Sequence, residues 1–161
     1  MKQRGFSLIE LLIVVAIILV IAAIAIPNLL RAKIQANEAS AVSSVRAINT
    51  AQVAYASTYA EVGYADDLAK LGSVSGGGAA TSAHAALLDW ILGCATQPCP
   101  KSGYSFKIVN VTQVGTLTTG YGITGVPTAP GVSGIRGFCS DNMNPVKYDP
   151  NGGTACTMDL Q

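Results

Sequence analysis

The first third of the chain combines a continuous apolar run with a periodic one. Residues 11–26 are sixteen apolar residues in a row, and extending the run back to Phe6 adds only Ser7 and Glu10 as polar positions. At about 1.5 Å per residue, a helix over 6–26 is about 30 Å long, which matches the hydrocarbon core of a bilayer. The segment therefore predicts a transmembrane helix.

A helical pattern continues beyond this run. There is no glycine between positions 28 and 60, and residues at spacings of three and four form one stripe: Ala41, Val45, Ile48, Gln52, Tyr55 and Tyr59. The remaining surface is expected to be polar, with Glu38, Ser40, Ser44 and Arg46. Pro27 is expected to kink or loosen the helix. We predict one helix from Phe6 to about Ala60, whose tyrosines pack against the rest of the chain.

From position 104 the apolar period changes to two. Strands are predicted at 104–108, 117–123, 135–139 and 146–148, with a turn at Val114-Gly115. Between the long helix and the first strand, a short helix is expected over 65–71 and a flexible loop over 72–78. An apolar face follows, flanked by Trp90 and formed by Leu87, Leu88, Ile91 and Leu92. The pattern predicts an α+β fold, a long N-terminal helix packed on a small antiparallel sheet of three or four strands.

Composition narrows the function classes. Half of the 161 residues are hydrophobic and only 12% are charged, with a net charge of +1. This excludes disorder and a basic nucleic-acid binder, and no specific nucleic-acid site is visible. With His84 as the one histidine and no phosphate loop, triad or acid–base pair, we predict no enzyme activity, no metal site and no cofactor.

The N-terminal flank suggests how the apolar segment is oriented. Lys2 and Arg4 precede it, which places the N-terminus in the cytoplasm, although Arg31 and Lys33 on the other side weaken that argument. A plain membrane anchor and a cleaved secretory signal are open alternatives. Cleavage after Ala25 would release a secreted, soluble binding module. A carboxylate such as Glu10 is costly inside a membrane, so it is a candidate functional residue.

The string GFSLIELLIVV at 5–15, after a short basic leader, resembles the class III signal of the type IV pilin and pseudopilin family. The resemblance implies cleavage between Gly5 and Phe6 by prepilin peptidase and N-methylation of Phe6. It also implies that Glu10 pairs with the N-terminal amine of a neighbouring subunit. The expected parts are a leader at 1–5, a transmembrane and assembly helix at 6–27, its amphipathic continuation at 28–60, and a globular head at 61–161.

This resemblance implies a structural function rather than a catalytic one. The chain would be a type IV pilus subunit that polymerises with copies of itself into a helical surface filament for adhesion, motility or DNA uptake. Its other partners would be the peptidase, an inner-membrane assembly platform and a cytoplasmic ATPase. Before assembly it would be held in the inner membrane. A pseudopilin of a type II secretion system is the alternative within the family.

The four cysteines all follow position 90, as expected for an oxidising exterior. Their spacing lacks the C-x-x-C of redox and zinc motifs, so disulfides are favoured over metal, with three connectivities possible. We choose Cys94–Cys99 and Cys139–Cys156, because the second resembles the cystine that closes a C-terminal loop in type IV pilins. Closing that loop is worth about 3 kcal/mol in a loop-entropy model.

The segment between the last two cysteines is rich in oxygen donors, namely Asp141, Asn142, Asn144, Asp149 and Asn151. Major pseudopilins of type II secretion, which this chain resembles in its N-terminal half, hold calcium near the C-terminus. No EF-hand spacing is present here, and Asn and Asp are ordinary turn residues. We therefore predict turns rather than a calcium site.

Overall fold

The computed structural model describes residues 7–73, 77–143 and 145–160. The chain divides into two compact units, Met1–Lys33 and Ile34–Gln161. Helix α1, Leu8–Thr58, begins in the first unit and ends in the second, close to the predicted bounds. It has few breakers, since Pro27 is the only proline and no glycine occurs within it.

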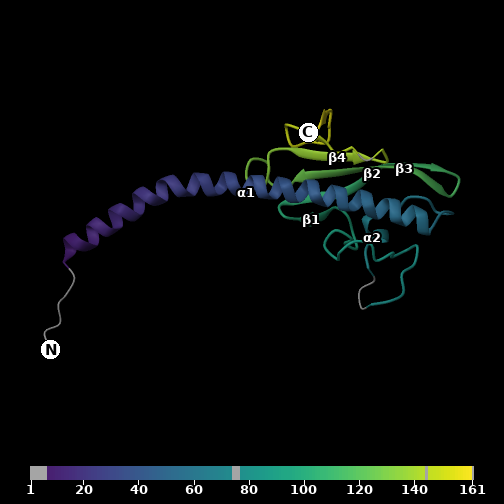
Figure 1. Cartoon of the computed structure of the whole chain (residues 1–161), viewed down its shortest axis with the longest axis horizontal. Helices are drawn as coiled ribbons and strands as arrows, with labels where there is room; N and C mark the ends of the chain where they lie inside the picture. The colour runs from purple at the N-terminus through teal and green to yellow at the C-terminus, as the bar shows by residue number, and fades with distance from the viewer. Residues whose placement is uncertain (1–6, 74–76, 144, 161) are drawn as a thin grey trace. The chain divides into compact units, whose positions relative to one another are not determined.

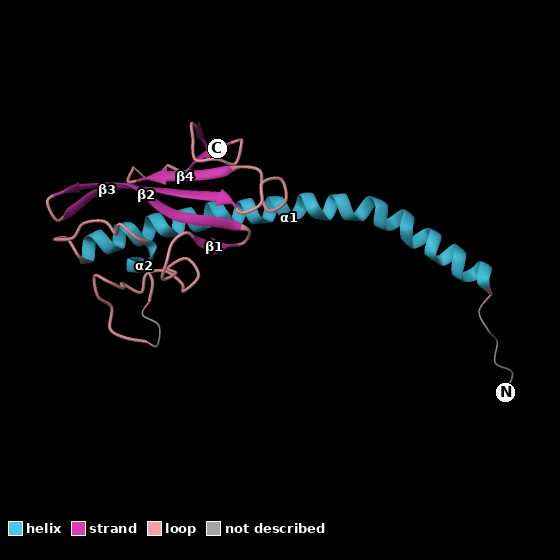
Figure 2. Ribbon diagram, turned by 180° about the vertical axis from the view of Figure 1, so that it is seen from behind, coloured by secondary structure: helices cyan, strands magenta, loops and turns pink. Residues whose placement is uncertain are grey.

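The second unit is an α+β domain with a six-stranded antiparallel sheet in sequential order, β1 to β6 (Figures 1 and 2). The fold class agrees with the prediction, but the sheet has more strands than the three or four expected. Each strand pairs with the next along the chain, and the strands are Cys99–Lys101, Tyr104–Val114, Leu117–Pro127, Gly137–Asp141, Lys147–Asp149 and Met158–Asp159.

The central hairpin, β2 and β3, confirms the predicted turn after Val114. Gly115 there has a φ of +64°, a conformation that glycine adopts without steric cost. Ile108 lies opposite Ile123, and Phe106 lies opposite Gly125, where an added Cβ would come within 2.8 Å of the Phe106 ring. The glycine therefore leaves the space in which this ring packs beneath α1.

The core lies between α1 and the sheet. The predicted stripe of α1 faces it, with Tyr55 fully buried and its ring 4.9 Å from that of Tyr59. The strands contribute aromatic rings to this core; the ring centres of Tyr104 and Phe138, for example, are 5.7 Å apart. The fully buried residues with the largest side chains are Tyr55, Tyr104, Phe106, Phe138, Ile48, Leu68, Leu71, Ile123, Gln52, Val45 and Cys99.

Two predictions for the polar side of α1 were wrong. Glu38 and Ser44, expected on the outer surface, are buried at 6% and 4% exposure, whereas Arg46 is exposed as expected. Glu38 lies three residues before Ala41, so it extends the buried stripe by one helical step. Its burial depends on partners from a distant part of the chain, described below.

The region between α1 and β1 also differs from the prediction. Helix α2 is only Leu68–Leu71, because Asp67 caps it by accepting from the N–H of Ala69. The four apolar residues at 87–92 do not share a face: Leu88 and Leu92 are buried, while Leu87 is 39% exposed. The reason is that the backbone here follows α2, with hydrogen bonds from Ala85 N to Lys70 O and from Leu87 N to Leu71 O.

Candidate assembly interface

The first turn of α1 is closed by the carboxylate of Glu10. Its Oε2 accepts a hydrogen bond from the backbone N–H of Ser7 at 2.9 Å. Glu10 stands three residues after Ser7, the position from which an acidic side chain reaches back to a free N–H at the start of a helix. Its charge also lies at the positive end of the helix dipole. Gly5 and Phe6, the predicted cleavage and methylation positions, lie outside the described residues.

The apolar side chains that follow are exposed in the single chain. Every large apolar residue from Leu8 to Leu30 keeps between 47% and 80% of its surface accessible. An 18-residue window of α1 has a mean hydropathy of 3.3 and no buried residue, so α1 has the length and composition of a membrane-spanning helix. An apolar surface of this extent in a folded chain marks contact with lipid or with other protein.

The chemistry of this surface is almost uniform. Between Leu8 and Leu30, Glu10 is the single charged residue. Pro27 lies inside α1, which is helical on both sides of it, and its kink stays a prediction. The next charges, Arg31 and Lys33, are exposed. The segment Leu8–Leu30 is therefore a long apolar helix with one carboxylate in its first turn.

The match to a protein-family model falls on this segment. Residues 1–26 match the family model described as the prokaryotic N-terminal methylation motif. The chain is 46% identical over 54 residues to the type IV major pilin protein PilA of Myxococcus xanthus, and 63% identical over 37 residues to the major component of the type IV wide pilus of Thermus thermophilus. It is also 44% identical over 50 residues to the type II secretion system core protein G of Escherichia coli. By these local matches the chain is similar to type IV major pilins and to a type II secretion core protein.

These matches are local. They cover 34%, 23% and 31% of this chain in the order given, and 24%, 28% and 34% of the relatives. The chain thus spans about a third or less of the length of the curated relatives it matches. No solved structure matches it.

Glu38 of α1 binds the loop that precedes β4. Its Oε1 accepts from the N–H groups of Ile135 and Arg136, both at 3.0 Å, and its Oε2 accepts from Nε and Nη2 of Arg136 at 2.9 and 2.7 Å. Burial raises the pKa of Glu38, but these hydrogen bonds and the guanidinium charge together bring it below its ordinary value. The carboxylate is thus held in its charged form.

Two buried amides on the same helix hold other segments. Gln52 donates to the carbonyl of Ala65 and accepts from its N–H, both at 2.8 Å. Asn49 donates to Ser140 Oγ at 2.7 Å and accepts from Tyr121 OH at 3.1 Å. Burial, with the nearby Tyr64 and Asp141, raises the pKa of Tyr121 to about 12. The helical stripe predicts that Gln52 is buried but not which groups it bonds; a polar residue at a stripe position is the signal that such partners exist.

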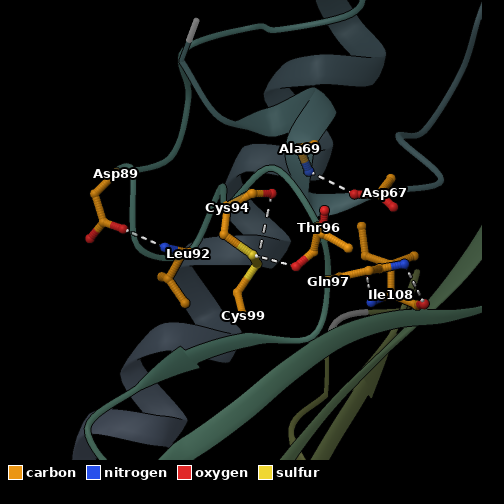
Figure 3. Close-up of a disulfide and its surroundings, with 9 residues drawn as sticks. All are labelled: Asp67, Ala69, Asp89, Leu92, Cys94, Thr96, Gln97, Cys99 and Ile108. Carbon is orange, nitrogen blue, oxygen red and sulfur yellow. Dashed lines mark hydrogen bonds between the residues drawn. A yellow bond between two sulfur atoms is a disulfide. The ribbon is translucent and has the colours of Figure 1, made fainter. Parts of the chain in front are cut away.

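Both cystines join the cysteines chosen from the sequence. Cys94 and Cys99, with Cα atoms 5.7 Å apart, close a short loop before β1. Figure 3 shows this cystine beside the side chain of Gln97, whose amide bonds the backbone of Ile108. Cys139 and Cys156, with Cα atoms 5.9 Å apart, join β4 to the chain's last segment.

The oxygen donors inside the C-terminal cystine loop serve turns. Asp141 accepts from the N–H of Met143, and Asp149 accepts from the N–H of Asn151, both at 2.9 Å. The second oxygen of Asp149 accepts from Ala155 N at 3.2 Å. Asn144 lies outside the described residues. Among the residues that the structure describes, no group of three or more His, Cys, Asp or Glu side chains could hold a metal ion.

Two further residues noted in the sequence lie in the segment between α2 and β1. His84, expected at the surface, is half-buried, with Nδ1 3.2 Å from the carbonyl oxygen of Ala69. Trp90 is 78% exposed. Neither belongs to the apolar segment Leu8–Leu30.

Proposed function

We propose that this chain is the structural subunit of a type IV pilus. It is cut after Gly5, N-methylated at Phe6 and polymerised through its N-terminal helix. The observation that carries the proposal is the exposed apolar segment Leu8–Leu30 with Glu10 as its single charge, within a chain whose residues 1–26 match the methylation motif. Cleavage removes five residues, which leaves a mature chain of 156.

Polymerisation gives the apolar segment a partner at every stage. In the inner membrane its side chains contact lipid, and in the filament they contact the same segment of other copies. Small residues such as Ala16, Ala22 and Ala23 let helices approach closely. The surface thus moves from one water-free environment to another, and no step exposes it to solvent.

Glu10 can determine the axial position of one copy's apolar helix against the next, because the rest of this surface is uniformly apolar. A charge in a low-dielectric environment is strongly penalised unless it is paired, so a copy whose N-terminal amine misses the carboxylate leaves two charges unsatisfied. We infer that the pair selects the correct axial position rather than adding much net stability. The bond from Ser7 N occupies one carboxylate oxygen, and the other can accept the amine of a neighbour.

The remaining partners follow from this route. Prepilin peptidase and an inner-membrane platform with its cytoplasmic ATPase would process and assemble the subunit. The precursor would have its N-terminus in the cytoplasm and its head outside, where both cystines form. The mature filament would lie on the cell surface.

Mass spectrometry of the mature chain tests the processing step. We expect an N-terminal Phe6 that carries one methyl group, in a protein recovered both from inner membranes and from sheared surface filaments. A chain that begins at Ile26 would overturn the filament proposal in favour of a secreted soluble module. An uncut chain found only in membranes would also overturn the filament proposal and would show that the apolar helix is a plain membrane anchor.

A type II secretion pseudopilin is the second candidate, favoured by the similarity to core protein G of Escherichia coli. Processing at Gly5 does not separate the two candidates. The location of the filaments and the effect of calcium do separate them. For a pilus subunit we expect surface filaments, and the same thermal stability of the subunit with calcium and with a chelator. Filaments confined to the periplasm, from a subunit that calcium stabilises, would favour the pseudopilin.

A further inference from the structure

Trp90 is an exposed aromatic residue on a backbone segment that hydrogen bonds hold in place. Its side chain is 78% exposed, yet its neighbours in sequence, Leu88 and Leu92, are buried. Asp89 fixes the backbone between them, because Oδ1 accepts from Leu92 N at 2.7 Å (Figure 3) and Oδ2 pairs with Lys101 at 2.8 Å. The Cys94–Cys99 cystine closes the same segment. A tryptophan whose backbone is fixed before binding has less conformational entropy to lose on contact, and tryptophans are frequent at the centres of protein interfaces.

A shallow groove of about 620 Å³ lies on α1 in the same unit. It is lined by Arg46, Asn49, Thr50, Val53 and Ala54. Val53 is 50% exposed, and Arg46 takes part in none of the ion pairs among the described residues. We name these five residues the helix groove. It offers an apolar floor beside one free cation, a combination that suits an aromatic ring.

The helix groove and Trp90 lie on different flanks of α1. Asn49, at the edge of the groove, bonds Ser140 of β4, whereas Ser40 bonds Ser102 of the β1–β2 turn and Tyr55 bonds the carbonyl of Ser82. Figures 1 and 2 agree: α2 and the loop before β1 lie on one side of α1, and β4 lies on the other. One chain therefore cannot fold its own Trp90 into its own groove.

The two flanks are also complementary in charge. The segment 59–101, which carries Trp90, has the carboxylates Glu61, Asp66, Asp67 and Asp89 against the cations Lys70 and Lys101, a net charge of −2. The helix groove carries the cation Arg46. Opposite charges on opposite flanks favour contact between two copies and disfavour contact of either flank with itself.

We propose that Trp90 of one copy binds in the helix groove of the next, with its ring on Val53 and Ala54 and against the guanidinium of Arg46. The contact joins two different patches, so it can propagate from copy to copy without closing, as a filament requires. It rests on the proposed pilus function, and it adds a contact between the Ile34–Gln161 units of two copies to the packing of the apolar segments.

Photo-crosslinking from position 90 tests the contact directly. A benzophenone amino acid at position 90 keeps an aromatic ring there, and the full chain is expressed in cells whose unmodified chain forms filaments. We expect sheared filaments to yield dimers in which position 90 is joined to the peptide containing residues 46–54, and the membrane-held precursor to yield none. Filaments that form normally but crosslink only to other segments would overturn the contact and leave the pilus function standing.

Matched substitutions give a second readout. Trp90→Ala and Arg46→Glu should each lower the yield of filaments about tenfold or more, the effect of losing an interface hot spot. Met143→Ala removes a side chain that is 81% exposed and should leave the yield unchanged. Intact cystines in the membrane-held precursor would show that the variants fold. Normal yield from Trp90→Ala would refute the contact, whereas absence of filaments from the unmodified chain would refute the pilus function itself.

Discussion

Glu38 of α1 and Arg136, which immediately precedes β4, are joined across 98 positions of sequence by two side-chain contacts, 2.9 and 2.7 Å long. The carboxylate also accepts hydrogen bonds from the backbone N–H groups of Ile135 and Arg136, the last two residues of the loop before β4. The guanidinium also lies 5.6 Å from the ring centre of Phe138 and 5.3 Å from that of Tyr148. One acidic side chain thus connects the helix, a loop and the sheet.

Replacing Glu38 should therefore destabilise the head. Glu38→Ala leaves two N–H groups and a partly buried guanidinium without their acceptor, and we expect a loss of about 2–4 kcal/mol in the free energy of unfolding. Urea unfolding of the full chain in detergent, followed by near-ultraviolet circular dichroism, measures the loss. The control is Glu61→Gln, an exposed acidic residue beyond the end of α1. Equal stability of the two variants would contradict the anchoring role of Glu38.

The same carboxylate should make the head sensitive to acid. Burial raises the pKa of Glu38, but the bonds from Arg136 and Ile135 together bring it below its ordinary value, and the hydrogen bond from Lys101 lowers the pKa of Asp89 below its ordinary value. A carboxylate with a lowered pKa in the folded state stabilises the fold above its unfolded-state pKa and loses this contribution as pH falls through its folded-state value. Thermal stability should thus decrease below about pH 4.5. In Glu38→Gln the decrease should be smaller, and an unchanged acid profile would count against Glu38 as its source.

Gln52 should be difficult to replace even though it makes no ion pair. Its amide satisfies both backbone groups of Ala65 in a fully buried position. Gln52→Met has a similar size but leaves a buried N–H and a buried carbonyl unpaired, so we expect a loss of about 2–4 kcal/mol. Thermal unfolding compared with Val53→Met, on the exposed side of α1, measures it. A Gln52→Met head as stable as the control would show that water replaces the lost bonds.

The sequence predicted the features that depend on local pattern. The ends of α1 and the β2–β3 hairpin follow from the apolar period and from Gly115, so they could be placed within a few residues. β1 and β6 could not, because strands such as Cys99–Lys101 and Met158–Asp159 are too short to show a period and exist through their pairing with a neighbour. Glu38 was misplaced for a related reason: an acidic residue signals exposure unless its partner, here Arg136, is known.

The candidate interface also has one part that the sequence predicts and one part that it does not. Glu10 could be singled out because one charge in an apolar run stands out in any sequence. The helix groove could not be predicted from the sequence. Whether Arg46 and Val53 lie on an open surface depends on which flank of α1 is covered by β4 and which by the loop before β1. Local chemistry could be read from the sequence, and a surface made by tertiary packing could not.

The two cystines should differ in their contribution to stability. The Cys139–Cys156 cystine encloses the longer loop, so Cys139→Ser with Cys156→Ser should cost about 3 kcal/mol, and the matched pair of substitutions at Cys94 and Cys99 about 2 kcal/mol. The Asp149 turn bonds and the β4–β5 pairing remain, so limited proteolysis should first cut within 150–157 while the sheet stays folded. Loss of the whole head on removing the longer cystine would show that it is required for folding rather than for pinning one segment.

Glu10 has two physical roles that substitutions can separate. Within the chain its oxygen caps the N–H of Ser7 at 2.9 Å, and in the proposed filament its charge pairs with a neighbour's amine. Glu10→Gln keeps an oxygen that can cap the helix but removes the charge, whereas Glu10→Ala removes both. If the charge selects register, both variants should be processed and held in the membrane yet form few or no filaments, as electron microscopy and the ratio of sheared to membrane-held subunit would show. Capping alone contributes about 0.5–2 kcal/mol to a helix, so normal assembly of Glu10→Gln with failure of Glu10→Ala would assign the residue to helix capping and remove it from the assembly mechanism.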